Sequence, residues 1–259
     1  MPVTQDDKAE RFRALHAGET FIIPNPWDVG SARVLEALGF EALATTSSGF
    51  AFTLGRRDGA ATLDEVAAHT RALSEASGLP VSVDLENGYG PDPKDAANAI
   101  ARVAEAGAVG GSIEDYDPDA GLYAAEQAAE RVAAAVEAAR ALPFPFTLTA
   151  RAENHIRGNP DLDDTIARLQ AYERAGADVL FAPGLPTLDA VRAVCGALKR
   201  PLNFMVGIPG KSFSVAELQA AGVKRISLAT SLYRVAMAAA RDAAHEVLQH
   251  GTFGYLDRP

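Results

Sequence analysis

The sequence predicts an α/β fold, a single (β/α)8 TIM barrel that spans residues 1–259. Short apolar runs alternate with alanine-rich helical stretches about eight times along the chain, and such alternation produces a parallel sheet with right-handed crossovers. Eight units within 259 residues favour a closed barrel over an open sheet. No low-complexity linker and no break in composition divides the chain, so we expect one domain.

The expected strands are short runs of apolar and β-branched residues. In chain order they are Thr20–Ile23, Ala42–Thr46, Val81–Asp84, Gly110–Glu114, Phe146–Ala150, Val179–Ala182, Leu202–Val206 and Arg225–Ala229. The clearest helical patterns are Leu63–Ser77, Ala96–Ala106, Ala124–Leu142, Leu162–Ala175, Leu188–Leu198, Val215–Ala221 and a last helix from about Ser231 to Gln249.

The joints between helices and strands have a common pattern. Several helical patterns end in a similar phrase, namely EALGFEAL, EAGAVGG, RAGADVL and AAGVKRI. In each phrase a glycine can end the helix in the left-handed conformation, and a strand follows after two or three residues. At the start of another helix, Asp28 in the phrase NPWD is expected to act as the N-cap.

Composition and charge exclude several classes of function. The formal net charge of −10 argues against nucleic acid or an anionic membrane as a partner. No apolar run approaches the ~18 residues that span a bilayer. Cys195 is the single cysteine, so no intrachain disulfide can form. The segment MPVTQDDKAERF lacks the apolar centre of a signal peptide, and together these features favour a cytoplasmic protein.

Three expected strands share an arrangement of polar residues. Because successive side chains of a strand face opposite sides, each strand has an apolar face and a face on which small polar residues lead to a charged one. The polar sets are Ser82, Asp84 and Glu86, then Ser112 and Glu114, then Thr147, Thr149 and Arg151. Functional residues of barrels come from the C-terminal ends of several strands, so we expect these charged residues to meet at the barrel mouth.

The acids at this mouth are a candidate metal site. Asp84, Glu86 and Glu114 are expected to converge there, with Asp58 as a fourth from the loop after the second strand. Clustered carboxylates cannot all stay ionised without compensation, and oxygen ligands without nearby His or Cys favour Mg²⁺ or Mn²⁺. The alternative is that these acids cap helices or pair with arginines.

Other residues at the mouth suit an anionic substrate. The guanidinium fork of Arg151 matches a carboxylate, although a buried salt bridge to Glu114 or Glu153 is an alternative that can hold at the same time. The end of the second strand carries Ser47, Ser48 and Gly49. Their hydroxyl and N–H groups either cradle an anionic oxygen or form an ordinary capped turn.

A family resemblance sharpens these expectations. The phrases NPWDVGSARVLEALGFEALATTSSGF, GRRDG, VDLENGYG, GSIEDY and TARAEN resemble the isocitrate lyase and phosphoenolpyruvate mutase superfamily in order, over nearly the whole chain. The most specific phrase is the DxDxGYG motif, here DLENGYG. The resemblance implies a (β/α)8 barrel whose last helix is exchanged between subunits of a homodimer or homotetramer. It also implies an Mg²⁺-dependent enzyme that acts on a small 2-oxo or 2-hydroxy acid through a metal-stabilised enolate.

The resemblance also assigns roles to residues. It implies that Asp84 is the nearest metal ligand and that Asp58, Glu86 and Glu114 hold the metal's water molecules. Glu86 stands where an aspartate is commoner. Ser48 and Gly49 match positions that hold the substrate carboxylate, with Ser47 beside them and Phe50 behind. Arg151 matches the arginine that grips the substrate oxygens, so the catalytic candidates are Asp58, Glu114 and Arg151.

Two departures from the family pattern leave the reaction open. The isocitrate and methylisocitrate lyases have a KKCGH-type loop after the fourth strand, whereas this chain has DYDPDAGLYAAEQ, so residues 117–123 offer no Cys, Lys or His. The lyases end the sixth strand with a glutamate, whereas this chain has FAPG. C–C cleavage by a lyase or an oxo-acid hydrolase is our first hypothesis. The alternatives are P–C chemistry on phosphonopyruvate-like substrates and a catalytically reduced 2-oxo acid binding protein.

The histidines are not expected to belong to the site. His155 lies near the mouth, but no acid stands at a spacing that would orient it, so a structural or surface role is expected. The remaining histidines fall in helices or tails and are expected to face solvent. They are His16, His69, His245 and His250.

Overall fold

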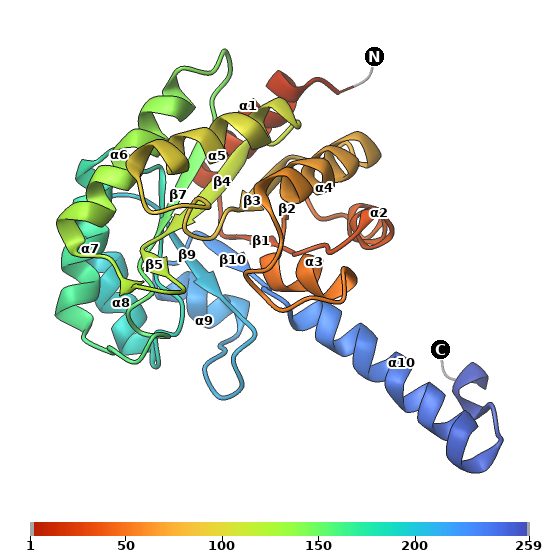
Figure 1. Cartoon of the computed structure of the whole chain (residues 1–259). Coiled ribbons are helices and arrows are strands. Elements are labelled where there is room, and N and C mark those ends of the chain that lie inside the picture. The colour runs from red at the N-terminus through yellow and green to blue at the C-terminus, as the bar shows by residue number, and fades with distance from the viewer. Residues whose placement is uncertain (1–2, 258–259) are drawn as a thin grey trace.

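The chain forms a nearly closed barrel of eight parallel strands surrounded by helices (Figure 1). This computed structural model describes residues 3–257. The strand order is β1-β10-β9-β8-β7-β4-β3-β2, and at the seam between β1 and β2 the Ala44 N–H donates to the Pro24 carbonyl at 3.0 Å. The predicted (β/α)8 class is therefore confirmed. Residues 1–2 and 258–259, the two ends of the predicted domain, lie outside the described residues.

The barrel strands lie where the sequence predicts them. They are β1 (Phe21–Ile23), β2 (Leu43–Ala44), β3 (Val81–Asp84), β4 (Gly110–Glu114), β7 (Thr147–Arg151), β8 (Val179–Phe181), β9 (Leu202–Met205) and β10 (Arg225–Ser227). The predicted bounds of β3 and β4 match at both ends. A small antiparallel hairpin, β5 (Tyr116–Asp117) and β6 (Gly121–Leu122), was not predicted.

The predicted helices are all present, and two further helices were not specified from the pattern. The set is α1 (Gln5–Ala17), α2 (Val29–Ala37), α3 (Ser47–Thr53), α4 (Leu63–Ala76), α5 (Pro93–Glu105), α6 (Ala125–Arg140), α7 (Leu162–Arg174), α8 (Leu188–Ala197), α9 (Val215–Ala220), α10 (Ser231–His250) and the 3₁₀ turn η1 (Gly254–Asp257). The additions are α1 and α3. Because α3 begins at Ser47, β2 is shorter than the predicted Ala42–Thr46.

The glycine joints behave as the repeated phrase predicts. After α2, α5, α7 and α9, a glycine takes a positive φ, which a side chain with a Cβ would disfavour. These glycines are Gly39 (φ 91°), Gly107 (φ 100°), Gly176 (φ 103°) and Gly222 (φ 96°). The predicted cap of α2 is also present, since the Asp28 carboxylate accepts from the Ser31 N–H at 2.7 Å.

Strand parity separates the hydrophobic core from the barrel interior. Val81, Val83 and Leu148 lie on the outer faces of β3 and β7, where they are buried against the helices. Ser82 and Thr149, on the opposite faces, are also buried but point into the barrel. The hydrophobic effect thus holds the helices on the sheet while polar side chains collect on the barrel axis.

Parity does not extend to Glu86, and this corrects the sequence interpretation. The strand ends at Asp84, and Glu86 takes a φ of 50°. The chain has therefore left the extended conformation, so alternation alone cannot place the Glu86 side chain.

Two of the histidines expected in solvent are half-buried. His16 lies between the rings of Phe12 and Phe21, and its Nδ1 is 2.8 Å from the Phe12 carbonyl. His69 stacks on Phe50 with ring centroids 4.0 Å apart. The prediction was wrong for both, because the helical pattern alone did not show that His16 packs between Phe12 and Phe21 or that His69 packs on Phe50.

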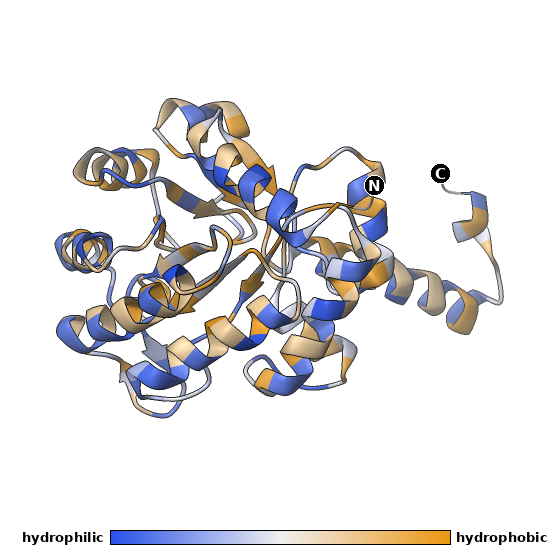
Figure 2. Cartoon of the chain, turned by 90° about the horizontal axis from the view of Figure 1, so that it is seen from above, coloured by the Kyte–Doolittle hydropathy of each residue, from blue (hydrophilic) through white to orange (hydrophobic). Residues whose placement is uncertain are grey.

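Helix α10 stands clear of the barrel. Figure 1 shows it extending away from the other helices, and Figure 2 shows hydrophobic residues along it. None of its residues is buried, although it carries exposed Val235, Met237 and Leu248. Among the described residues, no helix has both the length and the apolar character that a membrane span requires. The exchange of this helix with a neighbouring subunit remains a prediction.

If α10 packs on a second subunit, a charge on its apolar side will break the assembly. We predict that Met237→Glu shifts the protein from an oligomer to a monomer in size-exclusion chromatography with light scattering. The circular dichroism spectrum should not change, because Met237 is 50% exposed in the single chain. The control is Leu38→Glu, since Leu38 is 71% exposed outside α10. A monomeric wild type, or an unchanged mass for Met237→Glu, would contradict the exchange.

Candidate active site

A cavity of about 300 Å³ opens inside the barrel at the C-terminal ends of the strands. All eight barrel strands contribute to its wall, as does the first turn of α10. The contributing residues include Ile23, Ala44, Ser82, Asp84, Ser112, Arg151, Phe181, Asn203, Met205, Arg225, Ser227 and Arg234. This is where functional sites of barrels lie, and it is where the sequence predicted that the charged residues would meet.

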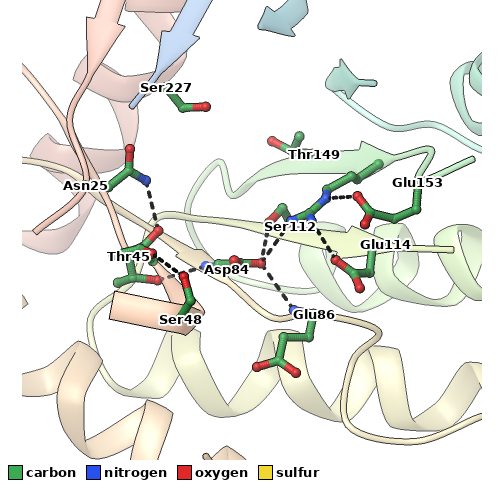
Figure 3. A network of polar contacts seen from close by, with 12 residues as sticks. Asn25, Thr45, Ser48, Asp84, Glu86, Ser112, Glu114, Thr149, Glu153 and Ser227 are labelled. Carbon is green, nitrogen blue, oxygen red and sulfur yellow. Dashed lines mark hydrogen bonds and ion pairs between the residues drawn. The ribbon is translucent and has the colours of Figure 1, made fainter. Parts of the chain in front are cut away.

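Asp84 lies at the centre of the polar contacts in this cavity (Figure 3). Its backbone N–H donates to the Thr45 hydroxyl at 2.9 Å. Its Oδ1 accepts from the Ser112 hydroxyl at 3.4 Å and from the Glu86 N–H at 3.3 Å. Among the described residues, the contacts of this carboxylate fall on Oδ1, which leaves Oδ2 for a ligand.

Arg151 joins acids from three positions. Its Nη2 lies 3.1 Å from Glu114 Oε2, its Nη1 lies 3.6 Å from Asp84 Oδ1, and its Nε donates to Glu153 Oε1. Burial alone would lower the pKa of Arg151, but these acids raise it well above its usual value. The salt bridges to Glu114 and Glu153 that the sequence offered as an alternative are therefore both present.

Carboxylates outnumber cations at this end of the barrel. Burial, with Asp84 next, raises the pKa of Asp58, and the same two causes raise the pKa of Glu86 to about 8. Burial also raises the pKa of Glu114. Arg151 and Arg157 face a group of acids, which are Asp58, Asp84, Glu86, Glu114 and Glu153. A further cation would remove the remaining repulsion.

The donor set fits a hard divalent cation that keeps most of its water. Among residues 3–257, no three His, Cys, Asp or Glu side chains lie close enough to ligate one ion together. This finding argues against a cage of direct carboxylate ligands. Mg²⁺, in contrast, usually takes one or two carboxylates and retains several water molecules. Asp84 Oδ2 would hold such an ion, with Asp58 and Glu86 in reach of its water.

Three hydroxyl groups converge on another part of the wall. The Oγ1 atoms of Thr46 and Thr230 are 3.1 Å apart, the Thr46 and Ser48 hydroxyls are 3.4 Å apart, and Ser48 bonds to Thr230. We call Thr46, Ser48 and Thr230 the hydroxyl cluster, and all three line the cavity. Of these three residues only Ser48 was predicted from the sequence, although Thr46 ends one predicted strand and Thr230 directly follows another.

The other candidates from the second strand have different surroundings. Ser47 and Asp58 both line the cavity, and the Ser47 side chain partly opposes the rise in the pKa of Asp58 that burial and Asp84 cause. Gly49 and Phe50 do not line it: the Gly49 N–H donates to Thr46 Oγ1 at 3.2 Å, and Phe50 packs on His69. Their predicted contact with substrate would need a rearrangement of α3, whereas their packing roles are evident.

The loop that departs from the lyase pattern, residues 117–123, is hydrogen-bonded to the turn after β3. Asp117 Oδ2 accepts from Asn87 Nδ2 at 3.3 Å and from the Tyr123 hydroxyl at 3.1 Å. The guanidinium of Arg131 lies 4.6 Å from the centre of the Tyr123 ring and donates to the Asn87 carbonyl. No residue of the stretch 117–123 lines the cavity, so this loop brings no proton donor to it.

A network of buried polar contacts outside the cavity, centred on Asp115, fixes the backbone position of Glu153. Asp115 Oδ1 accepts from the Glu153 N–H at 2.8 Å, and Asp115 Oδ2 bonds to Arg168 at 3.0 Å and to the Tyr172 hydroxyl at 2.6 Å. This network was not predicted from the sequence. Its only signal in the sequence was the acid directly after Glu114, the last residue of β4.

The chain is similar to known proteins over nearly the whole barrel. Residues 12–248 match a sequence model described as phosphoenolpyruvate phosphomutase. A crystal structure from Burkholderia cenocepacia J2315, assigned no more finely than lyase/mutase, is 53% identical with a TM-score of 0.96, covering 98% of this chain and 92% of that one. The matched residues 12–248 include every residue that lines the cavity.

Two curated relatives have named activities. The 2-methylisocitrate lyase of Escherichia coli strain K12 is 30% identical over 234 residues, which are 85% of this chain and 77% of the relative. The oxaloacetate decarboxylase of Bradyrhizobium diazoefficiens is 31% identical over 252 residues, which are 93% of this chain and 84% of the relative. The chain is thus similar to enzymes whose substrates are small carboxylates.

We predict that Asp84→Asn abolishes stabilisation by Mg²⁺. At a free Mg²⁺ concentration of 100 times Kd, binding should stabilise the wild type by about 2.7 kcal/mol, which thermal unfolding with and without the ion will measure. The control is Asp189→Asn, because the Asp189 side chain is 93% exposed on α8 and the variant should respond as the wild type does. An unchanged response of Asp84→Asn would contradict the metal assignment.

A matched pair of glycine substitutions tests the packing behind the hydroxyl cluster. A Cβ on Gly49 would lie 2.5 Å from Thr46 Cγ2, so Gly49→Ala should destabilise the fold by about 1–3 kcal/mol and weaken anion binding at Thr46. A Cβ on Gly196, within α8, meets no atom within 4 Å. Gly196→Ala should therefore stabilise by about 0.5–1 kcal/mol. Urea unfolding measures the free energy of unfolding of both variants. Equal changes in the two variants would refute the packing argument.

Proposed function

The chain belongs to the isocitrate lyase and phosphoenolpyruvate mutase superfamily, and from this premise we propose that it is an Mg²⁺- or Mn²⁺-dependent enzyme of C–C cleavage. Its substrate would be a small 2-oxo or 2-hydroxy mono- or dicarboxylate, and the reaction that of a lyase or an oxo-acid hydrolase. The observation that carries the proposal is that Asp84, Arg151 and the hydroxyl cluster share one cavity. A cation site, a guanidinium and neutral donors are what such a substrate requires.

Each group of side chains has a distinct task in this proposal. The hydroxyl cluster donates to the substrate carboxylate. Arg151 donates to the oxygen on the second carbon, and its Nη1 is free to turn toward substrate because its contact with Asp84 is the long one, at 3.6 Å. Glu114 and Glu153 hold the rest of the guanidinium, which reduces the reorganisation needed during the reaction. When bound, the metal supplies Lewis-acid stabilisation of the enolate oxygen.

Of the two carboxylic acids proposed as catalytic, Asp58 is better placed to exchange a proton. Asp58 lines the cavity, where burial and then Asp84 raise its pKa. Glu114 is 8% exposed, and both of its oxygens face arginines, with Arg151 at 3.1 Å and Arg157 at 3.6 Å. We therefore assign Glu114 to the orientation of Arg151, and Asp58 to proton transfer through water.

A second candidate is P–C chemistry on a phosphonopyruvate-like acid. It is favoured by the match of residues 12–248 to the phosphomutase sequence model and by the absence of the lyase loop. A non-catalytic 2-oxo acid binder would use the same donors.

We also propose that the enzyme is a cytoplasmic homodimer or homotetramer, supported by the single cysteine and by the uncovered apolar side chains of α10.

The test is turnover of a substrate panel followed by NMR. The panel comprises oxaloacetate, 2-methylisocitrate, 2,3-dimethylmalate and phosphonopyruvate, each with Mg²⁺ and with EDTA. We expect Mg²⁺-dependent C–C cleavage of at least one of the carboxylates. Formation of phosphate or phosphoenolpyruvate would instead select the phosphonate alternative. Stabilisation by these acids without turnover of any would identify a binding protein.

The variant Arg151→Lys separates recognition by Arg151 from charge alone. It keeps the positive charge beside Glu114 and Glu153 but loses the fork of donors. We expect kcat/KM to fall by about 10²–10³-fold, with the response of the unfolding temperature to Mg²⁺ unchanged. Full activity of this variant would contradict the role given to Arg151.

A further inference from the structure

At the floor of the cavity lies a buried arginine to which the proposed reaction gives no task. Arg225 on β10 is 5% exposed and lines the cavity from below. Its Nε donates to Asn203 Oδ1 at 2.8 Å, and its Nη2 donates to Thr149 Oγ1 at 2.9 Å. Its Nη1 lies 3.3 Å from His16 Nε2. The guanidinium therefore crosses the barrel axis between β7, β9 and α1.

The partners of Arg225 are all neutral. Burial, and then the charge of Arg225, lower the pKa of His16 to about 3, so this imidazole is an acceptor and not a counter-ion. No carboxylate of the described residues lies within ion-pair distance of Arg225, in contrast with Arg151 and Arg168. Burial lowers the pKa of Arg225 to about 9, so the guanidinium still carries its charge at neutral pH.

A buried cation without a counter-ion is costly, on the order of several kcal/mol. A packed barrel would avoid this cost with an apolar residue, since barrel interiors are commonly filled by Val, Ile and Leu. Arg225 has five N–H donors, and three of them are used by Asn203, Thr149 and His16. Two donors on the Nη atoms remain, which suits a bidentate contact with an anion.

The space between Arg225 and the proposed reaction centre is polar, and its length suits a short carbon chain with an acidic group at each end. Thr149, which contacts Arg225, precedes Arg151 by two residues on β7, a rise of about 7 Å. The wall along this depth carries small neutral groups, among them Ser82, Ser112 and Ser227. They can donate to a substrate but cannot neutralise it.

We propose that Arg225 forms an anion subsite at the barrel floor that receives the second acidic group of the substrate. The inference rests on the proposed function and narrows it to 2-oxo or 2-hydroxy acids with two carboxylates about the length of malate. The first carboxylate lies on the hydroxyl cluster and the second one on Arg225. The other wall, with Ile156, Phe181 and Ile208, has no charge for a second carboxylate and contacts the carbon chain.

The competing site for the second carboxylate is Arg234, the exposed cation on α10 that also lines the cavity. This residue provides a matched control, because Arg225→Gln and Arg234→Gln remove the same charge from the floor and from the rim. Glutamine retains an amide donor for Asn203, which limits the loss of packing. Thr149→Val is a further variant that leaves Arg225 in place and removes one of its neutral partners.

The first experiment compares the affinities of malate and lactate of the same configuration by calorimetry in Mg²⁺. These acids differ by one carboxylate. We expect the wild type and Arg234→Gln to prefer malate by at least tenfold, and Arg225→Gln to bind both acids about equally with its lactate affinity retained. An unchanged preference in Arg225→Gln, or a loss of preference only in Arg234→Gln, would overturn the subsite. Thr149→Val should keep the preference if Arg225 itself binds the carboxylate.

The second experiment does not depend on the proposed substrate. Crystals of the wild type and of Arg225→Gln soaked in bromide will locate bound anions by anomalous diffraction. We expect a bromide against Arg225 in the wild type and none there in the variant. Bromide at surface positions only would refute the subsite. Bromide at Arg225 in a protein that binds neither malate nor lactate would retain the subsite and reject the proposed function.

Discussion

The salt-bridge group around Arg151 is the interaction on which the rest of the site depends. One guanidinium meets Asp84 from β3, Glu114 from β4 and Glu153 from the segment after β7. These strands are neighbours in the barrel, so the charges set the relative position of three strand ends. Removal of a single member would leave a buried charge without a partner, which costs more than the pair contributes when it is complete.

The strength of this arrangement comes from residues outside the cavity. Asp115 points away from the barrel axis, yet it accepts from the Glu153 N–H and is held by Arg168 and Tyr172 of α7. Glu153 in turn holds the Nε of Arg151. The position of the Arg151 guanidinium is thus linked through the sheet to a surrounding helix, which favours a site formed in advance over one assembled on binding.

The sequence could predict the barrel and the location of its site because both follow from local patterns. Glycine joints, alternating strands and the charged residue that ends each polar row are visible without any contact information, and β3 and β4 were predicted to the residue. Contacts distant in sequence could not be predicted in this way. Thr230 meets Ser48 across the barrel seam, and His16 reaches Arg225 over 209 positions. Neither pairing leaves a periodic signal.

The charges of the site are arranged along the barrel axis, and this arrangement has a chemical consequence. Acids crowd the mouth around Asp84, whereas the floor carries Arg225 without an acidic partner. Before a cation binds, the mouth repels an anionic substrate, and the attraction of the floor acts over a longer distance through a low-dielectric interior. A divalent cation at Asp84 would offset most of this negative charge and so weaken the repulsion at the mouth. Binding of the metal before the substrate is therefore the order that this distribution of charge favours.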